Sequence, residues 1–134
     1  MIFFDTNVLV YYTVNQYENK QRLSEKLIEE AIRDDCFFIS PLVMTEYIFI
    51  LSKLKIRDEN SDKISFFNKF VKSSISNIEI TEAYKICQKI DFCRNINDAI
   101  HLVVAQKYCH KLITFDSDFK RFKEFTNIDI EVLS

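Results

Sequence analysis

Two aspartates in this chain follow short apolar runs, at positions where a carboxylate could take part in catalysis. Asp5 comes directly after Ile2-Phe3-Phe4, and Asp116 comes directly after the run from Leu112 to Phe115. Both runs are typical of short buried strands. Ligands of open α/β sheets bind in the crevice outside the carboxyl ends of the strands, so acids on two neighbouring strands would face one crevice. The alternative for Asp5 is that it only caps the following helix, because aspartate is a favoured capping residue.

Two further acids lie on segments that the sequence predicts to be helical and largely buried. Asp98 stands in the first turn before residues 99–105, which are apolar almost all round. Glu46 shares a helix face with Val43 and Tyr47. An unpaired buried carboxylate is costly, so Glu46 is expected to need a partner or a metal ion. For Asp98, the simpler interpretation is a favourable interaction with the helix dipole.

Four carboxylates that converge on one crevice repel each other unless a cation lies among them. Oxygen ligands of this kind suit Mg²⁺ or Mn²⁺. Such ions generate hydroxide from water and stabilise the leaving oxygen of a phosphodiester. The acids therefore indicate metal-assisted hydrolysis as the reaction class.

The elements that must position these acids alternate between strands and helices, which favours an α/β fold with a parallel sheet. Among the predicted helices, residues 63–75 carry one apolar stripe, with Phe66 and Phe70 displaced to its side, where they would face either a partner or a wide core. The predicted strands are 2–4, 36–39, 78–80, 112–115 and 128–133, and the predicted helices are 21–34, 41–55, 63–75, 81–93 and 97–108.

The composition indicates one globular domain over residues 1–134. No apolar run reaches the ~20 residues of a membrane span, and the chain opens on a strand-like run, so neither a membrane anchor nor a signal peptide is expected. Cys36, Cys87, Cys93 and Cys109 have no metal-ligand spacing and are expected to be reduced thiols of a cytoplasmic protein. A zinc site of Cys93, Cys109 and His110 is the weaker alternative.

The net charge of −2 gives no general basic surface for nucleic acid, so a phosphate-containing substrate would need local cations. The chain has no glycine. Backbone positions that need positive φ must therefore fall to Asn, Asp or His, with Asn77, Asn95 and His110 as candidates.

Four motifs in this order resemble those of the PIN-domain ribonucleases, and at this chain length those of the small VapC-type toxins of toxin–antitoxin pairs. The motifs cover nearly the whole chain. They are Asp5-Thr6-Asn7-Val8-Leu9, Thr45-Glu46, Asn97-Asp98-Ala99-Ile100-His101 and Thr114-Phe115-Asp116-Ser117-Asp118-Phe119.

The resemblance implies a three-layer α/β/α PIN-like domain with a central, mainly parallel sheet of four to five strands. It also implies Mg²⁺- or Mn²⁺-dependent endonucleolytic cleavage of RNA, a homodimer, and inhibition by a co-expressed antitoxin. By position, the acidic metal site would consist of Asp5, Glu46, Asp98 and Asp116, with Asp118 as a further ligand or a supporting acid. Thr6, Asn7 and Thr114 would orient the carboxylates through hydrogen bonds.

His101 lies one turn after Asp98 and could be a ligand or a base. A role as a hydrogen-bonded support or core residue is favoured, because ions that prefer hard oxygen ligands rarely recruit imidazole. The cluster of Lys120, Arg121 and Lys123 could bind RNA phosphates or could be a solvated helix face.

Two other interpretations compete with a ribonuclease. The first is a haloacid-dehalogenase-type phosphatase, because Asp116-x-Asp118 resembles its nucleophile and acid. That family places the pair on its first strand, whereas only a short segment follows Asp118 here. The second is a catalytically inactive PIN-like binding or dimerisation module, which the retention of all four acids disfavours.

Overall fold

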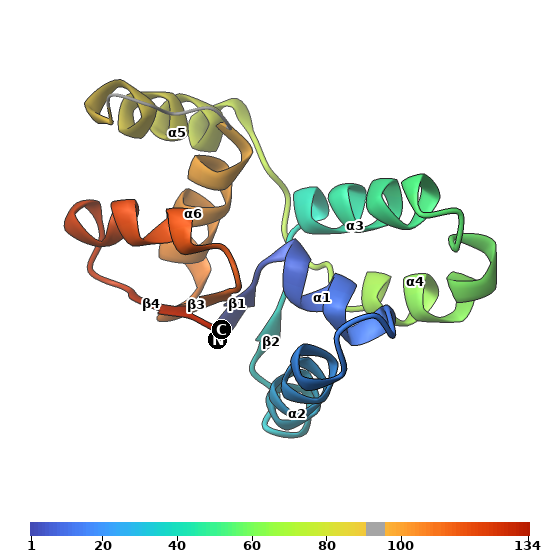
Figure 1. The fold of residues 1–134 in the computed structure, drawn as a ribbon. Coiled ribbons are helices and arrows are strands. Elements are labelled where there is room, and N and C mark those ends of the chain that lie inside the picture. Colours follow the sequence, from blue (N-terminus) through green and yellow to red (C-terminus); the bar gives the residue numbers. More distant parts are fainter. Residues whose placement is uncertain (91–95) are drawn as a thin grey trace.

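The computed structural model describes residues 1–90 and 96–134. Within these residues a small parallel sheet is surrounded by helices (Figure 1). In chain order the elements are β1 (Ile2–Phe4), α1 (Thr6–Thr13), α2 (Glu18–Arg33), β2 (Phe37–Phe38), α3 (Pro41–Lys53), the 3₁₀ segment η1 (Asp58–Asn60), α4 (Ser61–Asn68), α5 (Asn77–Lys89), α6 (Ile96–Tyr108), β3 (Lys111–Thr114), the 3₁₀ segment η2 (Ser117–Phe125) and β4 (Asp129–Val132).

The four strands lie in the order β2-β1-β3-β4 and all pair in parallel. The chain leaves β1 toward β2 on one side and returns to β3 on the other, so the strand order reverses between β1 and β3. Phe4 pairs with Ile113, which brings the next residues, Asp5 and Thr114, together on adjacent strands. The expected binding crevice of such a sheet therefore opens beside Asp5.

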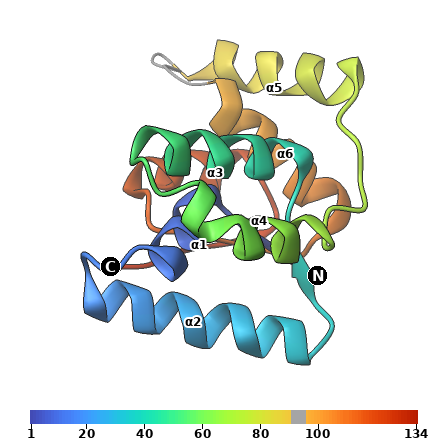
Figure 2. The ribbon, with the colours of Figure 1, turned by 90° about the vertical axis from the view of Figure 1, so that its right-hand side faces the viewer.

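Helices pack on both sides of the sheet, as expected for a three-layer α/β fold. Figure 1 shows α2 on one side of the sheet and α5 and α6 on the other, and in Figure 2 α1 lies between α2 and α3. Helix α5 packs on α6 and lies farthest from the sheet (Figures 1 and 2). Helix α6 in turn contacts α3 and β3, so the helix that carries Asp98 is held against the strand that leads to Asp116.

Aromatic rings fill much of the core. Phe3, Phe4 and Phe67 are completely buried, and the Phe67 ring lies 5.6 Å from the ring of Tyr47 between centroids. Burying one such side chain contributes roughly 1.5–3 kcal/mol to stability. Phe70 is half-buried with its ring 5.1 Å from that of Phe37, so it belongs to a wide core. Phe66 packs on Phe67 and Phe70 but stays 38% exposed.

Helix α3 begins as the sequence predicts. Ser40 is the N-cap, its hydroxyl accepts a hydrogen bond from the Val43 N–H at 3.2 Å, and Pro41 is the first helical residue. The cap satisfies an otherwise unpaired donor of the first turn. This start sets the register that places Glu46 on the inner part of α3.

Three predictions for the middle of the chain are wrong. Residues 78–80 are not a strand but part of α5, and Thr81 does not cap that helix, because its N-cap is Ser76. The helix predicted for 63–75 is α4, which ends at Asn68 because the chain then extends and Val71 pairs with Ile39 beside β2.

Positive φ angles occur at Asp35 (55°) and Lys55 (62°), directly after the ends of α2 and α3. In both cases the N–H of the next residue bonds to a carbonyl five residues earlier, which is the Schellman pattern that glycine usually completes. The prediction that Asn, Asp or His adopts positive φ is confirmed at Asp35 and wrong at Lys55. The candidates Asn77, which opens α5, and His110 were wrong, because the positive φ angles occur at helix ends; Asn95 lies outside the described residues.

Cys36 and Cys109 are free thiols, as expected. Burial raises the pKa of Cys109 to about 12, so this thiol is unreactive near neutral pH. Cys87 is disulfide-bonded, which corrects the expectation that it is reduced. Cys93 lies outside the described residues, and with it the alternative zinc site. In the part of the chain that the structure describes, no helix has the length and apolar character needed to cross a membrane.

Candidate active site

Asp5 lies at the carboxyl end of β1 and is 5% exposed. Its Oδ1 accepts the Thr6 N–H at 2.7 Å, which makes Asp5 the N-cap of α1. Its Oδ2 accepts the Thr114 hydroxyl at 2.7 Å and the Asn7 side-chain amide at 3.1 Å. Asp5 is therefore a helix cap, as the simpler interpretation proposed, and is also bound by a second strand.

Burial raises the pKa of Asp5 above its ordinary value, although the His101 charge and the hydrogen bonds from Thr114 and Thr6 act in the opposite direction. Burial thus disfavours the ionised form of Asp5 even though this form accepts hydrogen bonds. A cation close to the carboxylate would stabilise the ionised form. The surroundings of Asp5 therefore favour a nearby cation.

Glu46 reaches the same place from α3. Its Oε1 accepts the Thr6 hydroxyl at 2.7 Å and lies 2.6 Å from His101 Nε2, and its Oε2 accepts the Asn97 amide at 3.4 Å. Burial would raise the pKa of Glu46, but the hydrogen bond and charge of His101, with the bonds from Thr6 and Asn97, lower it. Glu46 thus has the partner that its position required.

His101 is 1% exposed and lies inside the cluster. Its Nε2 is 3.8 Å from Asp5 Oδ1 as well as 2.6 Å from Glu46. Burial opposes protonation, but the hydrogen bond to Glu46 and the charges of Asp5 and Glu46 raise its pKa overall. Because an ionised Glu46 only accepts, Nε2 carries the proton of this bond. This geometry fits the favoured supporting role of His101.

Asp98 lies in the first turn of α6, at the edge of the same cluster. Burial raises its pKa to about 7, and the charges of Asp5, Asp116 and Glu46 add to the effect while His101 opposes it. A helix-dipole interaction alone would lower the pKa of an acid in this turn. The other three acids therefore repel the charge of Asp98, as expected when four carboxylates share one crevice.

Asp116 follows β3 and is half-buried, and its Oδ1 accepts the Asp118 N–H at 2.9 Å. The Asp116 N–H donates to the Thr114 hydroxyl at 2.9 Å, so Thr114 links Asp5 to Asp116. The Asp118 side chain is 67% exposed and lies 3.8 Å from Arg121. The two acids therefore differ: Asp116 acts on Asp98, whereas Asp118 is a surface partner of Arg121.

The profile of the PIN domain family matches residues 2–124. The chain belongs to the PIN-domain family. Ribonuclease VapC2 of Methanocaldococcus jannaschii is 30% identical to it over 145 aligned positions, gaps included, and the match covers 96% of this chain and 93% of the relative. The resemblance predicted from the four motifs is confirmed.

Two solved structures share this PIN fold. VapC20 of Mycobacterium tuberculosis, described as a sarcin-ricin loop cleaving toxin, superposes with a TM-score of 0.76 at 16% identity, covering 92% of this chain and 95% of the other. VapBC2 from Rickettsia felis, solved with a DNA fragment of its promoter, gives a TM-score of 0.69 at 21% identity, covering both chains fully.

The donor atoms of this PIN site suit a divalent cation. One potential ligand atom each of Asp5, Glu46 and His101 lies within 4.8 Å of the others. The charges of Asp5, Asp116 and Glu46 add to the effect of burial on the pKa of Asp98, so Asp98 and Asp116 lie within electrostatic range of this group. Carboxylate oxygens are the ligands that Mg²⁺ and Mn²⁺ prefer, so the residues present fit such an ion.

The basic cluster lies on η2, and Lys120, Arg121 and Lys123 are all exposed. Arg121 pairs with Asp118, two residues beyond Asp116. These side chains are close to the site in the chain.

Sequence reasoning missed the contribution of two groups. Asn97 donates to Glu46, and the backbone N–H of Phe115 donates to Asn7 Oδ1 at 3.0 Å. Asn97 directly precedes Asp98 in the first turn of α6, which was the available signal. The bond to Phe115 joins two distant segments and had no signal in the sequence.

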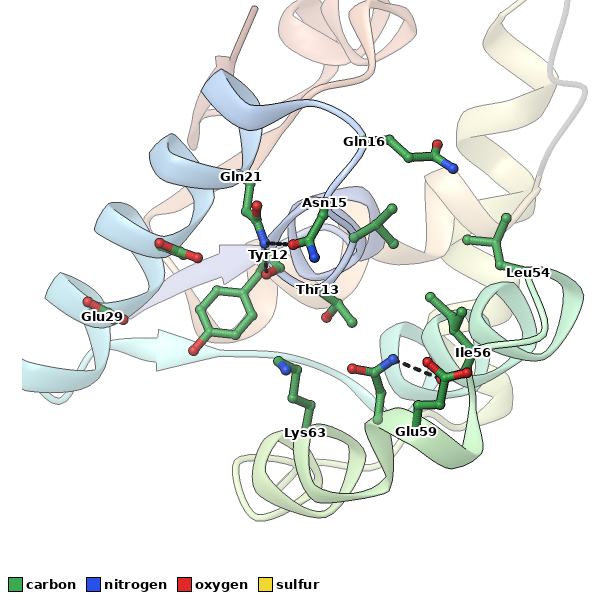
Figure 3. A pocket seen from close by; sticks show the side chains of 13 residues that line it. Tyr12, Thr13, Asn15, Gln16, Gln21, Glu29, Leu54, Ile56, Glu59 and Lys63 are labelled. Carbon is green, nitrogen blue, oxygen red and sulfur yellow. Dashed lines mark hydrogen bonds between the residues drawn. The ribbon is translucent and has the colours of Figure 1, made fainter.

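A surface hollow of about 560 Å³ is separate from the acid cluster (Figure 3). Glu25, Glu29 and Glu59 contribute to its wall, so its charge resembles that of RNA rather than complementing it. The hollow is therefore a poor candidate for the substrate site. Its lining consists of Tyr12, Thr13, Val14, Asn15, Gln16, Gln21, Glu25, Glu29, Leu54, Ile56, Glu59, Asn60 and Lys63.

Proposed function

We propose that this PIN-domain protein is an endoribonuclease that hydrolyses RNA phosphodiester bonds with Mg²⁺ or Mn²⁺, and that it is the toxin of a toxin–antitoxin pair. The observation that carries the proposal is the cluster of carboxylates at the point where the strand order reverses, with the pKa of Asp98 raised to about 7 by burial and by the other acids. The 30% identity to a VapC ribonuclease over nearly the whole chain supports RNA as the substrate.

Asp5, Asp98 and Asp116 would hold the ion directly, and Glu46 would complete the catalytic acids. A bound Mg²⁺ or Mn²⁺ would supply the activation of water and the stabilisation of charge on the phosphodiester oxygens. Asp118 is the weaker ligand candidate, because its side chain is 67% exposed and pairs with Arg121.

The neighbours of the acids would hold them in place. Thr6, Asn7 and Thr114 donate hydrogen bonds to Asp5 or Glu46 and leave other carboxylate lone pairs for a cation. His101 would orient Glu46 through the bond from Nε2. Such supports keep a site in its productive geometry before substrate arrives.

Lys120, Arg121 and Lys123 would bind RNA phosphates beside the acids. Their exposure and their position shortly after Asp116 in the chain support this role. A protein with a net charge of −2 needs such local cations to retain a polyanion.

The partners would be a cognate antitoxin protein and a second copy of the chain, in the cytoplasm. Structures of toxin–antitoxin complexes share the fold, including one from Klebsiella pneumoniae with a TM-score of 0.67 at 21% identity. Exposed apolar side chains such as Phe49 (66%) and Ile78 (63%) support further contacts with protein.

Cleavage of a labelled RNA of mixed sequence with Mg²⁺, with Mn²⁺ and with EDTA tests the proposal. Wild type should cut only with an ion, and Asp116→Asn should cut at least about a hundredfold more slowly, because Asn can keep the cap but not the charge. Asp62→Asn, an exposed first-turn aspartate of α4, is the control. Equal cleavage in EDTA, or by Asp116→Asn, would contradict the proposal.

A further inference from the structure

An aromatic platform, formed by Tyr11, Tyr17 and Phe115, lies beside the acid site with Lys20 over its rings. The Tyr11 ring centroid is 4.8 Å from that of Phe115 and 5.7 Å from that of Tyr17, both edge to face. Lys20 Nζ lies 4.9 Å from the Tyr11 centroid and 5.5 Å from each of the others. Three rings therefore surround one ammonium group.

The platform is joined to the site by two short connections. Phe115 stands between Thr114 and Asp116, and its N–H is bonded to Asn7 Oδ1 at 3.0 Å. Asn7 also donates to Asp5, and Tyr11 lies one helical turn after Asn7 on α1. Tyr11 is therefore about one helical turn from Asn7, the residue that donates a hydrogen bond to Asp5.

The platform is accessible and held in shape. Tyr17 is 55% exposed, and Tyr11, Phe115 and Lys20 are half-buried. The connection that carries Tyr17 is fixed by Gln21, whose amide donates to the Tyr12 carbonyl at 3.3 Å and to Asn15 Oδ1 at 2.8 Å (Figure 3). A surface that is both ordered and exposed loses little freedom when it binds a ligand.

Lys20 makes no ion pair with a carboxylate among residues 1–90 and 96–134, and its ammonium group lies over the three rings. A cation–π contact at an exposed site is weak, so a phosphate could draw the ammonium away and uncover the ring faces. The acidic hollow, whose lining includes Gln21 but none of the three rings, repels a polyanion, so the platform is the favoured path for a strand leaving the acids.

We infer that the aromatic platform binds an unpaired nucleobase of the RNA substrate next to the scissile phosphate, by stacking on Tyr17 and Tyr11, while Lys20 binds the adjacent phosphate. Single-stranded nucleic acid is bound in this way by aromatic rings combined with cations. The inference rests on the proposed function and assigns it a preference for single-stranded RNA.

Binding of a fluorescein-labelled single-stranded RNA of mixed sequence tests the inference. The measurement uses the Asp98→Asn protein in Mn²⁺, so that the RNA stays intact, and adds Tyr17→Ala, Tyr17→Trp or Lys20→Gln. Tyr17→Ala should weaken binding about 5- to 100-fold, and Tyr17→Trp should restore it, because indole also stacks on bases. Tyr84→Ala is the matched control, since Tyr84 is 56% exposed on the distant helix α5.

Cleavage by the protein with its native acids gives the second readout. Tyr17→Ala should raise KM far more than it lowers kcat, and the same RNA in double-stranded form should be cut poorly by all variants. If wild type cuts RNA and Tyr17→Ala matches Tyr84→Ala in both measurements, the platform inference fails while the proposed function stands. If wild type neither binds nor cuts RNA, both fail.

Discussion

Replacing Asp98 by asparagine removes a charge that the metal-free crevice disfavours. The pKa of Asp98 rises from 3.8 to about 7 in the folded protein. At about 1.36 kcal/mol per unit, this rise is equivalent to roughly 4 kcal/mol. Because Asp98 is only partly buried and solvent screens its charge, we expect about half of this penalty, roughly 2 kcal/mol.

The pH dependence follows from the raised pKa. Below about pH 4, Asp98 is protonated in both the folded and the unfolded states, so it has no effect on stability. Between about pH 4 and 7 the unfolded state releases the proton and the folded state keeps it, so the stability of wild type falls as pH rises. Asp98→Asn should therefore match wild type near pH 4 and melt roughly 8 °C higher near pH 8.

Thermal melts in EDTA and in a Mn²⁺ titration provide the assay. Mn²⁺ at a hundredfold excess over its Kd should stabilise wild type by about 2.7 kcal/mol, whereas Asp98→Asn, short of a ligand, should gain much less, so its advantage should disappear. Asp62→Asn should change little in either condition. An advantage of Asp98→Asn in EDTA that is equal at pH 4 and pH 8, or no advantage at all, would refute this account of the crevice.

Two other predictions concern the basic cluster and the helix ends. Replacing Lys120, Arg121 and Lys123 together by alanine should weaken RNA binding and reduce the slope of log K against log salt by about 0.7–0.9 for each phosphate that the protein no longer neutralises, whereas an unchanged slope would make the cluster a solvated face. Lys55→Gly should raise the free energy of unfolding in urea by about 1 kcal/mol, because glycine adopts the positive φ of this position without strain, while Lys53→Gly, at the last residue of α3, should lower it by up to about 1 kcal/mol. A decrease in the stability of Lys55→Gly would contradict the Schellman interpretation.

The acids could be located from the sequence because strand ends and helix starts are local features. A short apolar run followed by Asp is visible at both Asp5 and Asp116. Their convergence required β1 and β3 to be neighbours, which no local pattern states and which the strand order confirms. The roles of the individual acids stay predictions.

The pairing inside the site could not be predicted. The bond between His101 and Glu46 joins α6 to α3 across 55 positions, and only the packing of the two helices creates it. Residue type alone suggested that His101 has a hydrogen-bonded role. That its partner is Glu46 could be learned only from the structure.

The segment around Ile78 shows how an alternating pattern can mislead. Ile78 and Ile80 suggested a strand, but Glu79 between them is buried and both isoleucines are exposed. Ser76 caps α5 and hydrogen-bonds to Glu79, which matches the Ser-x-x-Glu spacing of a capping box. That spacing was the stronger signal, because it names specific donors and acceptors and not only apolar positions.

The most direct test of the central claim is to measure RNA cleavage and Mn²⁺ binding on the same proteins. The rate of cutting a trace amount of labelled RNA should rise over the same range of Mn²⁺ concentration that stabilises wild type against heat. Asp5→Asn should shift both curves together to higher Mn²⁺, because one cluster of acids serves both processes. Cleavage that proceeds in EDTA, or that Asp5→Asn leaves unchanged while Mn²⁺ binding is abolished, would contradict catalysis at this site.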